Sequence, residues 1–398
     1  MKAQHKVAMA TVGLGLGLFS LSMMPQATTV TPTGPQVNTG DEYPAPGTLG
    51  GPIAGLTQMQ LNRWAAGREV FDRDFHEVDG LGSPSYNADS CRACHQDGAM
   101  GGGGGLVLNV SRFANDNGGV GPFTDLPGGQ GLSKFMLPAL NDREEYDDTT
   151  ADVFEQRQTP PIFGAGRIEA IAAVTILANE DLTDANGDGI YGIGRIVMVN
   201  GAPEVGRFGW KNQVPLIIDF TRDAMNGECG ITTPDNGRGF GISSDGDAIA
   251  DPELSTADAG SISFFMSNLA EPPRTGSNDP EVLMGETLFT TVGCNLCHKP
   301  TLADNMGQPV RLYSNLLLHN VMPANYRGMS EPGGDVGYFG TPPLWGIRHS
   351  APYMHDGRAS DLNLAILAHE GEASGVTAAY VALDQMDKDA LIAFLNDI

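Results

Sequence analysis

The sequence repeats one five-residue frame, C-x-x-C-H, at two distant places, as CRACH and as CNLCH. The six fixed residues of the two frames are Cys91, Cys94, His95, Cys294, Cys297 and His298. In such a frame both thiols can add to the vinyl groups of a haem, and the histidine that follows is then placed beneath the iron as its proximal ligand. The repeat therefore predicts two covalently bound c-type haems.

A zinc site and a redox dithiol are the two alternatives to haem. Four cysteine thiolates would make a tetrahedral zinc site, but the histidine at the same place in both frames would then have no role. A redox dithiol gives this histidine no role either, and the frames lack the surrounding βαβ pattern. Haem attachment accounts for every fixed residue.

The amino terminus has the pattern of an export signal. Lys2 and Lys6 precede an apolar run over residues 7–24 without charge, which predicts a signal peptide over residues 1–27 or, if it is not cleaved, a membrane anchor. Residues 28–55 are rich in Thr, Pro and Gly and are expected to form a flexible lead-in. We expect a periplasmic protein, in which covalent attachment prevents loss of the haems.

The chain is strongly acidic, with a formal net charge of −25 and only 23 Lys and Arg residues. Such a surface repels nucleic acid and anionic membranes, so neither is an expected partner. A cationic protein partner is compatible with this charge, although solubility explains it equally well.

Apolar residues at helical spacing accompany both frames. Residues 67–75 place Val70, Phe71 and Phe75 on one face, and residues 285–292 predict a short helix before the second frame. The last thirteen residues predict a helix with Asp387 as its N-cap. Two helices flanking a covalent haem are typical of class-I cytochromes c. We therefore expect a mainly α protein of two tandem class-I cytochrome c-like domains.

The predicted domains span residues 56–274 and 275–398, and the first carries a long loop-rich insertion. The five consecutive glycines at 101–105, directly after CRACH, fit a loop around a haem edge or a flexible tip. We favour the flexible tip.

Several blocks resemble a known family. They are DGLGSPSYNADSCRACH (79–95), QTPPIFGAGRIEAI (158–171), GRFGWKNQVP (206–215), DPELSTADAGSISFFMSNLAEPPR (251–274) and TPPLWGIRHSAPYMHDGRASDLNLAILAHEGEA (341–373). The last block is similar to the carboxyl-terminal signature of bacterial di-haem cytochrome c peroxidases. All of them resemble the di-haem oxidoreductase family more closely. The resemblance runs from about residue 60 to the carboxyl terminus.

The resemblance implies roles for two residues near the haems. Counting from His355 at the spacing of the peroxidases reaches His369, which would be the second axial ligand of the haem bound by His298, with Met354 as the alternative ligand. Trp210 matches an aromatic residue that relays electrons between the haems of the relatives, although tryptophan is also a common core residue.

The resemblance also implies a carboxylate above the amino-terminal, peroxidatic haem. Glu228 in NGECGIT matches it, and Glu169 in GRIEAI is a second candidate whose neighbour Arg167 could simply pair with it. A glutamine usually found upstream is missing, and Asp219 stands in that segment instead. The task of such a carboxylate is to take a proton from the inner oxygen of peroxide and return it to the leaving oxygen.

An EF-hand-like half-loop, DANGDGIYG, places oxygen ligands at Asp184, Asn186 and Asp188. Arg195 stands where the closing glutamate is expected, so calcium and an ordinary Asx turn remain equal alternatives. The loop at 244–253 is a weaker version of the same pattern.

Three functions fit these features. The first is a peroxidase-like oxidoreductase in which electrons from a small cytochrome or cupredoxin enter at the carboxyl-terminal haem and reduce hydrogen peroxide at the His95 haem. The second is a di-haem electron carrier without a substrate, and the third is an oxidase or oxygenase acting on another molecule. His76 is a sixth ligand for the first haem only in a closed resting form. The relatives form dimers, so a homodimer is also expected.

Overall fold

The computed structural model describes residues 43–82, 85–124, 131–136 and 150–398. The expected signal peptide and most of the lead-in lie outside the described residues. Within the described part of the chain, no helix combines the length and the hydrophobicity needed to cross a bilayer. Contacts within the chain group residues 37–398 into one unit, so the expected boundary at 274/275 stays a prediction.

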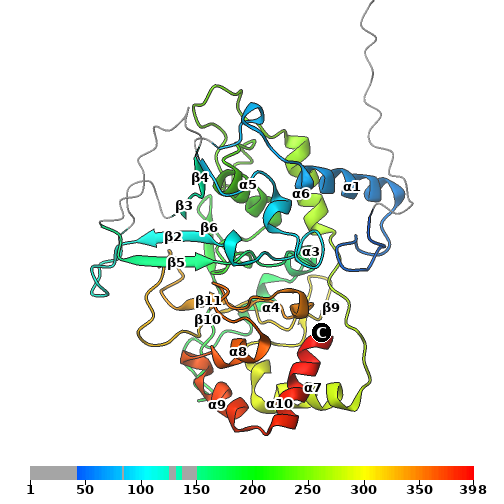
Figure 1. The fold of residues 1–398 in the computed structure, drawn as a ribbon, viewed down its shortest axis with the longest axis vertical. Helices are drawn as coiled ribbons and strands as arrows, with labels where there is room; N and C mark the ends of the chain where they lie inside the picture. Colours follow the sequence, from blue (N-terminus) through cyan, green and yellow to red (C-terminus); the bar gives the residue numbers. More distant parts are fainter. Residues whose placement is uncertain (1–42, 83–84, 125–130, 137–149) are drawn as a thin grey trace, which may run out of the picture. The chain divides into compact units, whose positions relative to one another are not determined.

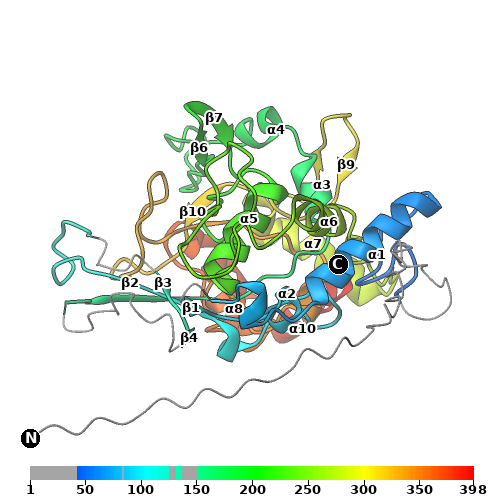
Figure 2. The ribbon, with the colours of Figure 1, turned by 90° about the horizontal axis from the view of Figure 1, so that it is seen from above.

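The first helix pair consists of α1 (Gln58–Asp72) and α6 (Thr256–Ser267), which lie side by side (Figure 1, Figure 2). They approach closely at Gly67, where an added Cβ would lie 2.0 Å from the carbonyl oxygen of Ser261. One turn further along each helix, the rings of Phe71 and Phe265 pack with their centroids 5.0 Å apart. The pair therefore needs a residue without a side chain at this crossing.

The second helix pair, α7 (Pro280–Val292) and α10 (Gln385–Asp397), has the same construction (Figure 1). An added Cβ at Gly285 would lie 2.0 Å from the carbonyl oxygen of Ala390, and one turn further Phe289 and Phe394 pack at 5.4 Å. Both helices match the expected ones. The N-cap of α10 differs, because Asp384 accepts the backbone N–H of Asp387; Asp387 lies inside the first turn.

The two pairs are copies of one arrangement, in which a glycine crosses the partner helix and a Phe–Phe contact follows four residues later. In each pair the first helix precedes a C-x-x-C-H frame along the chain and the second helix follows it. The first frame forms α2 (Cys91–Cys94) and the second begins with the 3₁₀ turn η4 (Cys294–Leu296). The fold thus contains the same helix pair twice.

The expectation of a mainly α protein needs correction, because the described part of the chain is 33% helical and 14% strand. The strands are short: β1 (Ser85–Tyr86), β2 (Val110–Ala114), β3 (Gly131–Leu132), β4 (Phe135–Met136), β5 (Val153–Arg157), β6 (Ile196–Val199), β7 (Ala202–Val205), β8 (Leu302–Ala303), β9 (Pro309–Val310), β10 (Leu318–Asn320) and β11 (Tyr338–Gly340). The largest sheet has the order β3-β2-β5, with Val110 opposite Arg157. Most of these strands, β2 to β7, lie in the expected insertion, where they pair antiparallel in small sheets.

The remaining helical segments are short, apart from one. They are η1 (Glu77–Asp79), η2 (Leu106–Leu108), α3 (Ala165–Glu169), α4 (Ala173–Leu177), α5 (Ile217–Cys229), η5 (Ile347–His349), α8 (Leu362–Leu367), η6 (Gly371–Ala373) and α9 (Ser374–Ala382). The longer one, α5, packs against α6, and its buried residues belong to the same core as Trp64 and Phe71.

The three largest apolar clusters among the described residues organise the interior. One surrounds α1 and α6, and a second surrounds α7 and α10. The third joins residues from both parts of the sequence, because Ile168 and Ile176 pack with Leu312 and Leu317. The hydrophobic effect of burying this joint cluster stabilises the contact between the insertion and the carboxyl-terminal region.

Candidate haem sites and the residues between them

The first frame places its histidine against a backbone carbonyl. Cys91 and Cys94 lie in α2, His95 ends that turn, and the Nδ1 atom of His95 lies 3.1 Å from the carbonyl oxygen of Gly102. Burial lowers the pKa of His95 to about 4, so the ring is neutral. A neutral imidazole that donates from Nδ1 keeps the lone pair of Nε2 for a metal.

The glycines after this frame are not a flexible tip, which corrects that expectation. Gly101, Gly102, Gly103 and Gly104 are buried. A Cβ at Gly102 would lie 1.8 Å from the carbonyl oxygen of Asp97, and the carbonyl of Gly102 is the group that holds His95. The run is glycine because the backbone packs tightly around the histidine it orients.

The second frame brings two histidine rings close together, with the edge of one toward the other. Nδ1 of His298 lies 3.0 Å from the carbonyl oxygen of Tyr313, and Nδ1 of His369, just after α8, lies 2.7 Å from that of Ala365. The two ring centroids are 6.5 Å apart. Burial lowers the pKa of both histidines, that of His298 to about 3. Both rings are therefore neutral and oriented in the same way as His95.

The spacing of this pair fits one metal between two imidazoles. Metal–nitrogen bonds of about 2 Å and a distance of about 1.1 Å from each nitrogen to its ring centre place two such centroids about 6.2 Å apart. The first site differs, since the ring that contacts His95 is that of Phe71, at 6.1 Å. The spacing at the second frame supports His369 as the second ligand at His298.

The cysteines fit haem attachment better than zinc. Burial raises the pKa of Cys91 to about 12 and that of Cys294 to about 11, which disfavours the thiolate that zinc requires. Among the residues that the structure describes, the one group of three or more His, Cys, Asp or Glu side chains that converge is Asp245, Asp247 and Glu253. The two cysteine pairs therefore do not meet in a Cys₄ site.

A second repeat, missed in the sequence reasoning, supports both frames. TPPIFG (159–164) and TPPLWG (341–346) share four of six residues. The backbone of Pro160 lies beside His95, and Thr159 hydrogen-bonds Cys94. In the second copy the hydroxyl of Ser314, next to the carbonyl that holds His298, donates to the carbonyl of Thr341 at 2.6 Å. A search for internal repeats would have found this signal.

Glu228 lies in the last turn of α5, close to the first frame. Its Oε2 accepts a hydrogen bond of 2.7 Å from Nδ2 of Asn87, and its backbone carbonyl accepts the N–H of the same residue. Burial raises the pKa of Glu228, although the bond from Asn87 opposes the shift. Its charge also raises the pKa of Cys94. The structure thus places the expected carboxylate close to the first frame, and Asn87 holds it through one of its two oxygens.

Glu169 makes a structural contact instead. Its Oε1 accepts the backbone N–H of Ile217 at 2.7 Å, at the start of α5, and Arg167 pairs with Glu271 and Asp304. These contacts favour a positioning role, because a carboxylate at a helix amino terminus stabilises the helix. Asp219, which stands in the segment of the missing glutamine, is fully buried and forms a bidentate pair with Arg238.

Trp210 lies among residues from both parts of the chain. Its Nε1 donates to the carbonyl oxygen of Gln158 at 2.7 Å, and its ring lies 6.4 Å from that of His355. Gln158 in turn donates to the carbonyl of Gly104. The tryptophan therefore connects the glycine loop of the first frame with the HDG turn of the carboxyl-terminal region.

The expected calcium loop is closed by its own side chains. Oδ1 of Asp184 accepts the N–H of Gly189, and Oδ1 of Asn186 accepts that of Asp188. These are the bonds of Asx turns, and calcium there stays a prediction. The carboxylates that do converge belong to the weaker loop at 244–253.

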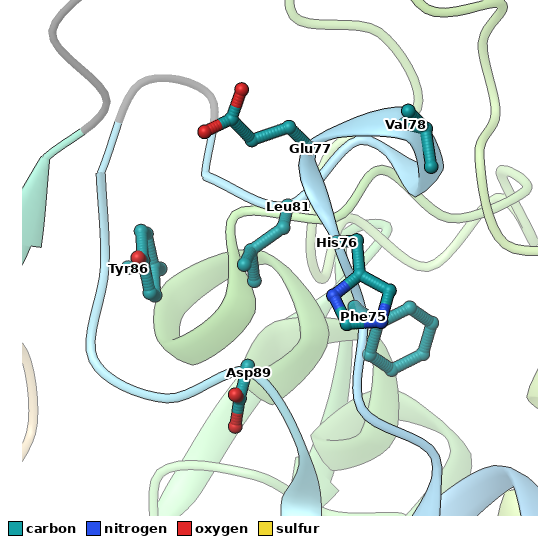
Figure 3. Close-up of a pocket in the computed structure, with 7 residues that line it drawn as sticks. All are labelled: Phe75, His76, Glu77, Val78, Leu81, Tyr86 and Asp89. Atoms are coloured by element: carbon teal, nitrogen blue, oxygen red, sulfur yellow. The ribbon is translucent and has the colours of Figure 1, made fainter.

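A cavity of about 430 Å³ lies at the segment that joins α1 to α2. Figure 3 shows its seven lining side chains, which come from the segment between α1 and α2: Phe75, His76, Glu77, Val78, Leu81, Tyr86 and Asp89. His76 is exposed at its wall. The seven lining residues include none of the cysteines or histidines of the two frames.

Residues 146–398, well over half of the chain, match the family described as "Di-haem oxidoreductase, putative peroxidase". The chain belongs to this family. The match includes the second frame together with Trp210, Glu228 and His369, whereas the first frame lies before it. Membership implies haem cofactors in this di-haem oxidoreductase, and the donor sets described above fit them.

Solved structures show only distant likeness to this di-haem oxidoreductase. A MauG-like protein associated with microbial copper homeostasis is 17% identical, with a TM-score of 0.42 over 89% of this chain and 93% of its own. The hydrazine synthase of Kuenenia stuttgartiensis is 17% identical, with a TM-score of 0.39 over 92% and 99%. At these TM-scores neither likeness supports an argument about this chain. No curated protein matches the sequence.

Proposed function

We propose that this di-haem oxidoreductase is an exported, c-type di-haem peroxidase, in which electrons enter at the haem held by His298 and His369 and reduce hydrogen peroxide at the haem held by His95. The observation that carries the proposal is the asymmetry of the two sites. One frame has a second histidine ring facing its proximal histidine, and the other has a carboxylate nearby.

The asymmetry supports a division of labour. A haem with two histidine ligands is low-spin and has no open position, which suits electron transfer, whereas a haem with one protein ligand can bind and reduce peroxide. The expected class-I cytochrome c architecture is supported by the duplicated helix pair. Calcium and a homodimer remain expectations within this proposal.

The side chains of this chain have defined tasks. Glu228 takes the proton from the inner oxygen of peroxide and returns it to the leaving oxygen, and Asn87 holds the carboxylate in place. Burial raises the pKa of Glu228, which makes the protonated carboxyl easier to form and so favours its taking up and returning a proton. Trp210 provides the aromatic step between the sites. A small cytochrome or cupredoxin is the proposed electron donor.

The test is low-temperature EPR of the purified holoprotein, oxidised and half-reduced, before and after stoichiometric hydrogen peroxide. We expect one high-spin and one low-spin ferric signal, with peroxide changing the high-spin one. His369→Ala should convert the low-spin haem while both haems stay covalently bound. His349→Ala is the matched control, because His349 does not face a proximal histidine.

Two low-spin signals that ignore peroxide in both redox states would overturn the proposal and leave an electron carrier. An unchanged spectrum of His369→Ala would overturn the axial assignment alone.

A further inference from the structure

Tyr326 lies between a buried carboxylate and a buried imidazole. Its hydroxyl donates to Oε2 of Glu155 at 3.1 Å, and the same oxygen lies 3.0 Å from Nε2 of His355. Glu155 is 4% exposed and His355 is 3% exposed. A phenol with a base on one side and an imidazole on the other, both shielded from water, is the arrangement that couples loss of an electron to loss of a proton.

Glu155 is an ionised acceptor. Burial opposes its ionisation, but the Arg157 guanidinium, whose Nε lies 2.7 Å from Oε1, and the backbone N–H of Met329 outweigh burial and lower its pKa. Buried and exposed side chains alternate along β5, so Val153, Glu155 and Arg157 all point into the interior. This places the Arg157 guanidinium next to the Glu155 carboxylate. The carboxylate is therefore ready to receive the phenolic proton.

His355 completes the arrangement as a neutral ring. Burial lowers its pKa to about 4, and within the described part of the chain its Nδ1 has no hydrogen-bond partner. With the hydroxyl of Tyr326 directed to Glu155, the proton of His355 is assigned to Nε2, which donates to the phenolic oxygen. The tyrosine oxygen thus keeps one hydrogen bond after its own proton has moved.

Tyr326 also lies next to the predicted aromatic relay. The ring of His355 lies 5.8 Å from that of Tyr326 and 6.4 Å from that of Trp210, so both aromatic residues contact the same imidazole. The backbone at Gly328 packs tightly against both groups, since an added Cβ there would lie 2.5 Å from both Glu155 Oε2 and the Tyr326 ring. Contact distances of this kind allow an electron to pass from the tyrosine toward Trp210.

We propose that Tyr326 is a redox-active tyrosine, with Glu155 as its proton acceptor and His355 as its second hydrogen-bond partner, that stores one oxidising equivalent after peroxide has reacted. The inference rests on the proposed function, because hydrogen peroxide acting through the His95 haem is the oxidant. Peroxide takes up two electrons and two protons to give two waters. The His95 haem would supply one of these electrons, and the two protons would come from solvent. When the His298 haem is already oxidised, the protein must supply the second electron from one of its own residues.

The step balances at named atoms. One electron leaves the Tyr326 ring through Trp210 for the peroxide-oxidised haem site. The O–H bond of Tyr326 breaks, and its proton forms a new O–H bond on Oε2 of Glu155. A neutral tyrosyl radical and a neutral carboxyl group remain, and return of one electron from the donor protein restores both.

The experiment adds one equivalent of hydrogen peroxide to the fully oxidised holoprotein, freezes the sample at successive times and records EPR. The wild type should show an organic radical beside the haem signals, and ring-deuterated tyrosine should narrow it. Tyr326→Phe should lose at least nine-tenths of the tyrosyl signal. Tyr353→Phe is the matched control, because the Tyr353 hydroxyl donates to the carbonyl of Ile347, which cannot take a proton.

The outcomes separate the two proposals. If peroxide leaves the haem signals of the wild type unchanged in both the oxidised and the half-reduced state, the proposed function fails. If the haem signals respond but ring deuteration changes nothing, or the tyrosyl signal survives Tyr326→Phe at full intensity, the inference about Tyr326 is wrong while the proposed function stands. The deuteration result needs no variant, so it decides the question even if Tyr326→Phe folds poorly.

Discussion

At the scale of single residues, three histidines are oriented by the same kind of hydrogen bond. His95, His298 and His369 each direct Nδ1 to a backbone carbonyl, and burial lowers the pKa of each. The two sites differ in their neighbours, because His369 lies near His298 whereas Glu228 lies near Cys94 of the first frame. We propose that Glu228 decides the chemistry of the first site.

Glu228→Gln is expected to lower the rate of peroxide reduction about 10²- to 10⁴-fold, the contribution typical of a positioned general base. The amide keeps the shape of the side chain but cannot take the proton. Because burial raises the pKa of Glu228, the carboxylate is lost on acidification at a higher pH than for an ordinary glutamate. The wild-type rate should therefore fall as the pH drops through this raised pKa. The rates of the Glu228→Gln variant, measured by stopped flow, should not show this fall.

Glu286→Gln is the control for this measurement, since Glu286 is half-exposed and pairs with Arg274 at 3.4 Å. It should leave the rate and its pH profile unchanged. A Glu228→Gln protein that turns over peroxide at the wild-type rate would remove Glu228 from the mechanism.

At the scale of elements, the two helix crossings depend on glycine. Gly285→Ala would drive a methyl group into the backbone of α10. Overpacking of this kind costs about 1–3 kcal/mol, which exceeds the gain of about 1 kcal/mol that alanine brings to a helix interior. We expect a lower melting temperature for the holoprotein in calorimetry.

Gly260→Ala in α6 is the matched control, because an added Cβ there meets nothing within 4 Å. It should raise the melting temperature slightly through helix propensity. Equal stability of the two variants would show that the α7–α10 crossing can open without cost, contrary to the observed packing.

At the scale of the whole molecule, we expect charge to govern the encounter with the proposed electron donor. With a formal net charge of −25, the protein should react faster with a cationic donor protein than with an anionic one. Screening shortens the reach of this attraction to about 8–10 Å at 0.1–0.15 M salt, so the second-order rate with a cationic cytochrome should fall as salt is added. The rate with a small neutral reductant should not. A rate with the cationic donor that rises with salt would contradict the proposed partner.

The sequence predicted the two attachment frames and both helices of the carboxyl-terminal pair, because fixed spacing and helical periodicity are local signals. It misjudged the glycine run, since only the backbone around His95 shows why residues 101–104 lack side chains. It also left Glu155, Tyr326 and His355 unconnected. Their contacts join positions far apart in the chain, and a single sequence contains no signal for such pairs.

The stretch from Glu155 to Pro160 contacts most of the residues to which we assign a part in electron or proton transfer. Glu155 binds Tyr326, Gln158 binds both Trp210 and the glycine loop, and Pro160 lies beside His95. An extended chain advances about 3.3 Å per residue. One inserted or deleted residue would therefore move all of these contacts out of register at once. The stretch can accept substitutions one at a time, but its length cannot change in evolution or in engineering without separating the tyrosine from the haem.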